Sequence, residues 1–273
     1  MCVGLANQLD VEALRGVAVQ VAGEAADLAR TVRDEAVTDG AVDTKSAETD
    51  VVTAGDRAAE RLVRDRLAEL RPGESVLGEE EGGDHALDGL RWVVDPIDGT
   101  VNYLYGFPWY AVSLAAQVDG RSVAGAVVEP VSGRVWSAAL GVGAFLGDRR
   151  LRVSAAERLD LALIGTGFAY TVERRKVQAE TAGKLLAEVR DIRRSGSAAL
   201  DLCAVAAGWL DGFYELGLNR WDWAAGALIA AEAGARLRLP GESGDGFADG
   251  TLVCATPGVA DDLKDALLRF GGV

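Results

Sequence analysis

The sequence has little of the chemistry on which disulfide scaffolds and many metal sites depend. It contains one histidine, His85, and three widely separated cysteines, Cys2, Cys203 and Cys254, with no CxxC pair among them. An odd number of scattered cysteines predicts neither a disulfide framework nor a thiolate metal site, and it favours a reducing cytoplasm. A single histidine cannot build a histidine-based zinc or iron centre. His85 lies in a polar stretch and is predicted to be an exposed loop residue.

Long apolar runs and excess positive charge are also absent. No segment approaches the ~18 to 20 apolar residues that cross a bilayer, and Met1 to Asp10 lacks a basic stretch followed by an apolar one. Membrane insertion and secretion are therefore not expected. The formal net charge of −14 opposes binding to nucleic acid or anionic lipid, which are polyanions. An anionic ligand would need metal cations to mediate its contact with this protein.

The residues that are present predict a globular fold whose first half combines helices and antiparallel strands. Apolar residues make up 49% and charged residues 26% of the 273 residues, enough for one large domain or two closely packed ones. Apolar residues at spacings of three and four predict a helix over 11–32, and a second helix is predicted to start at Thr53, where Asp56 closes a capping box. Apolar runs separated by turn signals predict strands at 92–94, 112–118, 123–128 and 135–139.

The second half of the chain is predicted to alternate strands and helices. A strand at 161–165 is followed by a polar helix from Glu173 and by apolar helices at 198–207 and 223–233. We therefore predict an N-terminal α+β half at 1–150 and a C-terminal α/β half at 151–273. The sequence contains no Pro-, Ser- or Gly-rich linker between them, so a packed interface is expected.

The most informative segment is 95–100, with the sequence DPIDGT, which directly follows the apolar run 92–94. Pro96 favours extended backbone at Asp95, and Asp98-Gly99 favours a turn. The two carboxylates can then converge while the amides after Gly99 point toward an anion. The same residue types are common in surface turns, so this motif alone leaves both interpretations open.

Two further acidic segments could complete a site, although each also has a structural explanation. Glu79, Glu80 and Glu81 follow a short apolar run, as a solvated loop would, and Asp222 lies at the start of an alanine-rich helix, where an aspartate commonly caps the backbone.

Taken together, these segments resemble the signatures of the inositol monophosphatase family in order and spacing over essentially the whole chain. The segments that carry the resemblance are Gly78-Glu79-Glu80, 95–103, 221–226, Lys45, Asp50, 53–56, Gly196 to Ala199, and Tyr214-Glu215. The resemblance implies a layered αβαβα sandwich of the sugar-phosphatase type, a homodimer, and two or three Mg²⁺ ions between the halves. It also implies hydrolysis of myo-inositol monophosphate by a metal-activated water without a covalent intermediate, and sensitivity to lithium. Hard carboxylate oxygens suit Mg²⁺.

The resemblance also assigns roles to individual residues. It implies that the metal ligands are Glu79, Asp95, the carbonyl of Ile97, Asp98 and Asp222, with Asp95 bridging two ions. Glu79, Thr100 and Asp56 are the implied catalytic residues, the last two as a hydroxyl-carboxylate pair that orients or deprotonates the attacking water. The implied substrate contacts are the amides of Gly99, Thr100 and Ala198 together with Asp98, Glu215 and Asp222. Glu215 would bind substrate hydroxyl groups.

Some features depart from the family pattern or leave alternatives open. Tyr103 stands where many members have phenylalanine, and Gly55 is expected to give the turn at 53–56 extra freedom. Arg193 and Arg194 could hold a second phosphate, although surface or dimer contacts are favoured. Alternative functions are hydrolysis of histidinol phosphate, fructose 1,6-bisphosphate or a nucleotide 3′-phosphate, or a non-catalytic role with the transcription machinery.

Overall fold

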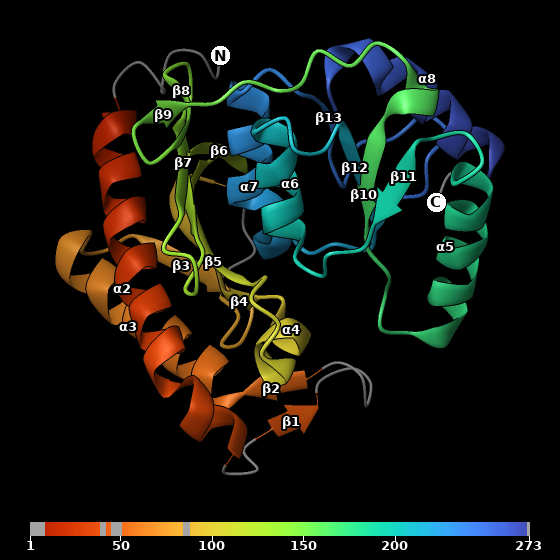
Figure 1. Cartoon of the computed structure of the whole chain (residues 1–273). Coiled ribbons are helices and arrows are strands. Elements are labelled where there is room, and N and C mark those ends of the chain that lie inside the picture. Colours follow the sequence, from red (N-terminus) through yellow and green to blue (C-terminus); the bar gives the residue numbers. More distant parts are fainter. Residues whose placement is uncertain (1–8, 39–41, 45–50, 84–87, 272–273) are drawn as a thin grey trace.

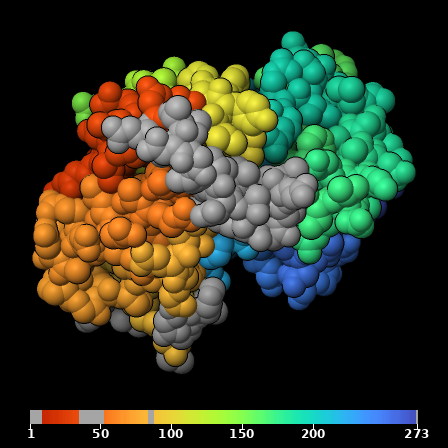
Figure 2. All heavy atoms as spheres, turned by 90° about the horizontal axis from the view of Figure 1, so that it is seen from below, coloured from red at the N-terminus to blue at the C-terminus, as the bar shows by residue number. Residues whose placement is uncertain are grey.

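A computed structural model of the chain describes residues 9–38, 42–44, 51–83 and 88–271. Lys45, Asp50, His85 and Cys2, which the sequence analysis singled out, lie outside the described residues. Figure 1 shows alternating layers of helices and sheets, with segments from the first half of the chain on one side and from the second half on the other. Seen from below, the red-to-yellow and green-to-blue segments again occupy opposite sides (Figure 2).

The first layer is a pair of helices. The helix predicted over 11–32 is confirmed and is longer, because α2 spans Val11–Thr38. Helix α3 spans Ala54–Leu70 and begins at the predicted capping box, in which the Thr53 hydroxyl accepts hydrogen bonds from the amides of Gly55 and Asp56. The Asp56 carboxylate accepts in return from the Thr53 amide at 2.7 Å. The small strands β1 (Val42–Thr44) and β2 (Val51–Thr53) pair antiparallel just before α3.

The second layer is a seven-stranded sheet in simple sequence order. Its strands are β3 (Ser75–Gly78), β4 (Leu90–Asp98), β5 (Ala111–Val118), β6 (Arg121–Val128), β7 (Val135–Ala139), β8 (Gly143–Leu146) and β9 (Arg149–Arg150). The predicted antiparallel meander is confirmed from β4 onward. The first pair, β3 with β4, lies outside the predicted meander and is parallel.

The middle layer consists of α6 (Ala198–Ala206) and α7 (Arg220–Glu232), which pack between the two sheets (Figure 1). Alanine is the most frequent residue in both helices because both of their faces are covered. A Cβ added at Gly226 would lie 2.9 Å from the Cβ of Leu202, so the two helices approach too closely for a larger residue. The predicted helix at 223–233 starts three residues later than observed, and Asp222 therefore lies in the first turn of α7.

The second sheet and two outer helices complete the five layers. The sheet has the order β11-β10-β12-β14-β13, with strands β10 (Leu163–Thr166), β11 (Asp191–Arg193), β12 (Gly212–Leu216), β13 (Arg236–Arg238) and β14 (Thr251–Ala255). Its outer face carries α5 (Val172–Leu185) and α8 (Pro257–Arg269), and the turn η1 (Leu159–Leu161) replaces the start of the predicted strand at 161–165. The predicted αβαβα architecture is confirmed. A domain division at residue 150 stays a prediction.

Two further observations bear on the sequence-based expectations. Cys203 and Cys254 are buried free thiols. Among the described residues, no helix combines the length and apolar character that a membrane crossing requires.

Candidate active site

A cavity of about 380 Å³ opens where the two halves of the chain meet. Nine of the ten residues implied as metal, catalytic or substrate contacts line it: Glu79, Asp95, Ile97, Asp98, Gly99, Thr100, Ala198, Glu215 and Asp222. Asp56, the tenth, lies behind Thr100. The fold therefore brings together residues that are up to 143 positions apart in sequence, from 79 to 222.

Strand β4 places two of these carboxylates through a local irregularity. The sequence analysis expected the strand to end at Val94, but β4 continues through Asp98. Residues three apart in a regular strand point to opposite faces of the sheet. Here Asp95 pairs with Ser113 and Asp98 pairs with Ala111, so β4 contains one extra residue relative to β5. This bulge turns Asp95 and Asp98 toward the same cavity.

The charges around the cavity make the ionised carboxylates costly in the absence of cations. Burial is the main cause that raises the pKa of Asp95 well above its usual value, and Glu79, Asp98 and Asp222 add to it by repulsion. A hydrogen bond to Glu79 further favours the protonated form of Asp95. Burial, followed by repulsion from Glu79 and Asp98, likewise raises the pKa of Asp222. Each of these carboxyl groups would be stabilised in its charged form by a nearby cation.

Asp98 also joins the two halves of the site. Its Oδ2 atom accepts hydrogen bonds from the hydroxyl of Ser197 at 2.6 Å and from the amide of Ala199 at 2.7 Å, at the start of α6. Burial raises the pKa of Asp98 to about 6 although these hydrogen bonds oppose the shift. The carboxylate is therefore fixed in orientation by a helix from the other half of the chain.

Thr100 and Asp56 form the pair that the resemblance implied. The Thr100 hydroxyl lies 3.1 Å from Oδ1 of Asp56 and 3.1 Å from the carbonyl oxygen of Ile97, and its single proton can be donated to either acceptor. The other oxygen of Asp56 caps α3 at Thr53. The same buried aspartate therefore serves both as a helix cap and as a partner of Thr100.

Gly99 provides the turn between β4 and the short helix α4 (Thr100–Tyr105). Its φ of 97° lies in the left-handed region that glycine adopts without strain. A Cβ at this position would lie 3.2 Å from the carbonyl oxygens of Trp109 and Gly196. The backbone can therefore pass close to the loop before α6 only because residue 99 has no side chain.

The carboxylates of the cavity are suitable ligands for magnesium. Among the described residues, however, no three His, Cys, Asp or Glu side chains lie close enough together to bind one metal ion as they stand. Six carboxylates line the cavity, and for three of the proposed ligands, Asp95, Asp98 and Asp222, burial and repulsion from Glu79 raise the pKa. Oxygen ligands without nitrogen or sulfur favour Mg²⁺ over zinc.

The cavity is also lined by Asp201 and Gly167, which the sequence analysis did not identify and which lie near the predicted contact Glu215. Asp201 of α6 is buried, burial raises its pKa, and one of its oxygens has no hydrogen-bond partner among the described residues. Burial also raises the pKa of Glu215 to about 8, and Arg194 partly opposes the shift. A Cβ at Gly167 would lie 1.9 Å from Oε2 of Glu215, so this glycine leaves the space for the carboxylate. The parallel pairing of β10 with β12 places Gly167 there.

The two neighbouring arginines have different surroundings. Arg193 is exposed and its guanidinium pairs with Asp191, in agreement with the surface role favoured for it. Arg194 instead lines the cavity. Arg193 is the last residue of β11, whereas Arg194 follows the strand in the segment that leads to α6.

The two departures from the family pattern contact each other. A Cβ at Gly55 would lie 2.5 Å from the hydroxyl oxygen of Tyr103, which donates a hydrogen bond to the carbonyl of Ala29 at 2.9 Å. The expectation that Gly55 loosens its turn is wrong, because this residue lies buried in the first turn of α3. Its function is to leave room for the tyrosine hydroxyl.

We therefore expect Gly55→Ala to lower the free energy of unfolding by about 1–3 kcal/mol through overpacking. Tyr103→Phe removes the hydroxyl and should cost about 0.5–1.5 kcal/mol through the lost hydrogen bond. The double variant should be more stable than the sum of the two losses predicts, by about 1 kcal/mol. Urea unfolding of the four proteins measures this coupling, and strictly additive losses would contradict the contact.

Comparisons with known proteins agree with the geometry. The family model described as the inositol monophosphatase family matches residues 10–269. An inositol-1-monophosphatase of Mycobacterium leprae is 56% identical, with 97% of this chain and 96% of the relative covered. The solved structure of Mycobacterium tuberculosis SuhB has a TM-score of 0.83 at 50% identity and covers 96% of this chain and 98% of its own. Nus factor SuhB of Escherichia coli is 36% identical, covering 93% and 98%.

The match extends through both sheets and the helices between them. Members of the matched family are metal-dependent phosphatases, typically with Mg²⁺, in agreement with the carboxylates that line the cavity. The family model, the identity to its members and the carboxylate-lined cavity agree, and the chain belongs to the inositol monophosphatase family.

Proposed function

We propose that the protein hydrolyses myo-inositol monophosphate to inositol and phosphate with the help of two or three Mg²⁺ ions, as a homodimer in the cytoplasm. The observation that carries this proposal is that the four proposed carboxylate ligands, Glu215 and the start of α6 all line one cavity. The names of the Mycobacterium relatives favour this substrate over histidinol phosphate and fructose 1,6-bisphosphate. The Escherichia coli Nus factor SuhB is less similar, at 36% identity, so a non-catalytic role with the transcription machinery is not favoured.

The ligands proposed for the ions are Glu79, Asp95, the carbonyl of Ile97, Asp98 and Asp222, with Asp95 shared between two ions. Bound Mg²⁺ would lower the pKa of a water, neutralise the leaving oxygen and orient the phosphate. The residues of the chain prepare this arrangement. Asp98 is held by Ser197 and Ala199 through Oδ2, so we assign its Oδ1 to the metal.

Thr100 and Asp56 are proposed to orient the attacking water and to receive its proton. Asp56 is already fixed by two hydrogen bonds from Thr53, so its remaining oxygen faces Thr100 in one orientation. The amides of Gly99 and Thr100 are proposed to hold phosphate oxygens. With the ions bound, this water would attack in line at phosphorus, and no side chain would form a covalent bond to the phosphate.

The amide of Ala198 and the carboxylate of Glu215 are proposed to bind the polyol hydroxyl groups. Glu215 lies on β12, across the cavity from β4. Although burial raises its pKa to about 8, cations in the cavity would lower the pKa again by attraction, so the ionised form is expected in the loaded site.

A panel of phosphate monoesters assayed with and without Mg²⁺ tests the proposal. We expect hydrolysis of inositol 1-phosphate to exceed that of histidinol phosphate, fructose 1,6-bisphosphate and nucleotide 3′-phosphates. Full activity in a chelator would refute the chemistry. A better turnover of histidinol phosphate would refute only the substrate.

Glu215→Gln tests the polyol contact separately. Loss of a charged hydrogen bond to a ligand costs about 1.5–3 kcal/mol, so kcat/KM for inositol 1-phosphate should fall roughly 10- to 150-fold. A simple aryl phosphate lacks the hydroxyl groups and should lose less. Gly167→Ala, whose Cβ would displace Glu215, should change the ratio in the same direction. Equal losses on both substrates would place Glu215 with the metals or the fold instead.

A further inference from the structure

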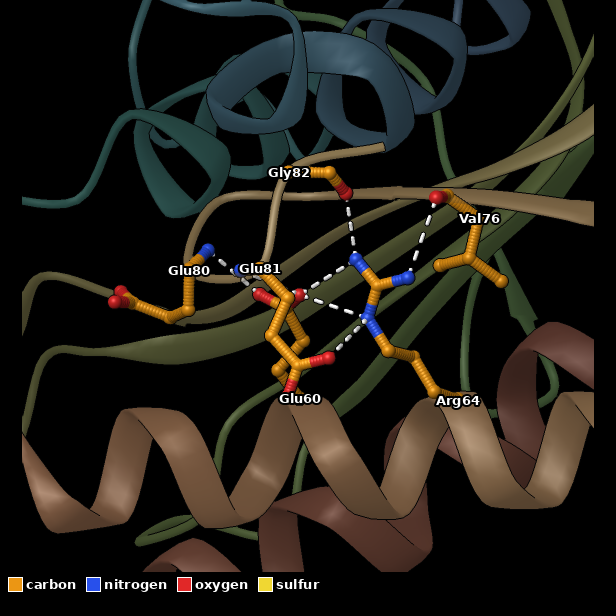
Figure 3. A network of polar contacts seen from close by, with 6 residues as sticks. All are labelled: Glu60, Arg64, Val76, Glu80, Glu81 and Gly82. Carbon is orange, nitrogen blue, oxygen red and sulfur yellow. Dashed lines mark hydrogen bonds and ion pairs between the residues drawn. The ribbon is translucent and has the colours of Figure 1, made fainter. Parts of the chain in front are cut away.

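The loop that carries Glu79 is attached to α3 by a partly buried ion pair, Glu60 with Arg64, that the proposed mechanism does not use. Glu60 of α3 is fully buried, and its two carboxylate oxygens accept hydrogen bonds from the loop backbone (Figure 3). Oε2 accepts from the amide of Glu80 at 2.7 Å, and Oε1 accepts from the amide of Glu81 at 3.0 Å. The residues held in this way directly follow Glu79.

Arg64, one turn further along α3, completes the attachment. Its Nε and Nη2 atoms donate to Oε1 of Glu60 at 2.9 and 2.8 Å. The same guanidinium donates to the carbonyl of Gly82 at 2.6 Å and to the carbonyl of Val76 on β3 at 3.4 Å. Figure 3 shows both side chains rising from one helix toward the loop. The pair therefore contacts the backbone before and after Glu79.

Gly78 leaves the space in which this carboxylate lies. A Cβ at Gly78 would lie 2.1 Å from Oε1 of Glu60. The loop closes on itself through a hydrogen bond from the amide of Gly78 to the carbonyl of Gly82 at 2.9 Å. The carbonyl of Gly82 thus accepts hydrogen bonds from both Gly78 and Arg64. The turn from Gly78 to Gly82 therefore has little freedom to rotate Glu79 away from the cavity.

We propose that Glu60 and Arg64 act as positioning residues that fix the direction of Glu79 and thereby set the affinity of the site for Mg²⁺. The inference rests on the proposed role of Glu79 as a metal ligand. A buried ion pair is a weak contributor to stability compared with apolar packing. Groups that orient a metal ligand, by contrast, typically change metal affinity about 10- to 100-fold when they are removed.

Glu60→Gln tests the proposal, because an amide presents one acceptor oxygen where the carboxylate presents two. We expect Mg²⁺ binding, measured by calorimetry, to weaken about 10- to 100-fold. Hydrogen exchange at the amides of Glu80 and Glu81 should accelerate. The kcat at saturating Mg²⁺ should return to within a few-fold of wild type, since the variant retains Glu79 itself. Arg64→Lys keeps the positive charge but cannot donate two parallel hydrogen bonds to Glu60. This second variant should weaken Mg²⁺ binding less than Glu60→Gln does.

Arg66→Gln is the matched control, because Arg66 lies on the same helix and pairs with Glu24 of α2 instead of the loop. It should leave Mg²⁺ affinity and the exchange of Glu80 and Glu81 unchanged. Equal weakening in this control, or wild-type Mg²⁺ affinity in folded Glu60→Gln, would overturn the inference. Glu79→Gln tests the ligand role of Glu79 separately from the positioning role of Glu60 and Arg64. Wild-type Mg²⁺ affinity in Glu79→Gln would overturn the ligand assignment. Weakened binding in Glu79→Gln together with normal binding in Glu60→Gln would overturn only the positioning role.

Discussion

Asp95→Asn should lower kcat/KM for inositol 1-phosphate by at least about 10³-fold while the protein keeps its fold. We propose that Asp95 is shared between two ions, and metal ions contribute several kcal/mol to the stabilisation of charge in a transition state. At about 1.4 kcal/mol for each tenfold change in rate, loss of this contribution gives the expected decrease. Steady-state kinetics across a range of Mg²⁺ concentrations measures it.

The stability of the metal-free variant distinguishes a ligand from a packing residue. Asp95 is buried among like charges that raise its pKa, so a neutral asparagine of the same size should leave the metal-free protein at least as stable as wild type. Asp201→Asn is the matched control, because Asp201 is also a buried aspartate at the cavity but is outside the proposed ligand set. It should retain Mg²⁺ binding. Near-wild-type turnover in purified Asp95→Asn would contradict the metal assignment.

The sequence predicted the proposed ligands better than it predicted how they converge. The DPIDGT segment, Glu79 and Asp222 could be recognised because carboxylates after strands and at helix starts form short local patterns. The bulge that turns Asp95 and Asp98 to one face depends on the pairing of β4 with β5, which no local pattern specifies. A regular strand would have placed these two side chains on opposite faces.

Residues whose role depends on a distant partner could not be identified from sequence. Glu60 reads as one of many charged residues in a polar helix, and only the fold shows that it holds the backbone after Glu79. Gly55 and Tyr103 are 48 positions apart, and only the fold shows that the tyrosine hydroxyl occupies the space beside the glycine. Gly167 gave no signal, because its partner Glu215 lies on another strand. In each case, the informative contact joins residues far apart in sequence.

Withdrawal of metal should abolish activity and make the stability of the protein fall more steeply with rising pH. Activity should vanish in a chelator and return with Mg²⁺, whereas excess Ca²⁺ should inhibit because its coordination shell is larger and looser. At a Mg²⁺ concentration of about 100 times Kd, binding adds about 2.7 kcal/mol to the free energy of unfolding. That gain corresponds to a rise in Tm of roughly 5 to 11 °C. Calorimetric scans with and without Mg²⁺ measure it.

The sign of the pH effect follows from the carboxyl groups of the cavity. The folded protein raises the pKa of Asp98 to about 6 and that of Glu215 to about 8, and it also raises the pKa of Asp95 and Asp222. Groups with a raised pKa stabilise the fold below their unfolded values of about 4, and this stability is lost as pH rises through the folded values. The Tm of metal-free protein should therefore fall between pH 5 and 8, over the window set by these shifts. With Mg²⁺ at a fixed concentration it should fall less or rise, because the cations compete with protons for the same oxygens. Identical pH slopes with and without Mg²⁺ would show that the ions bind away from these carboxylates.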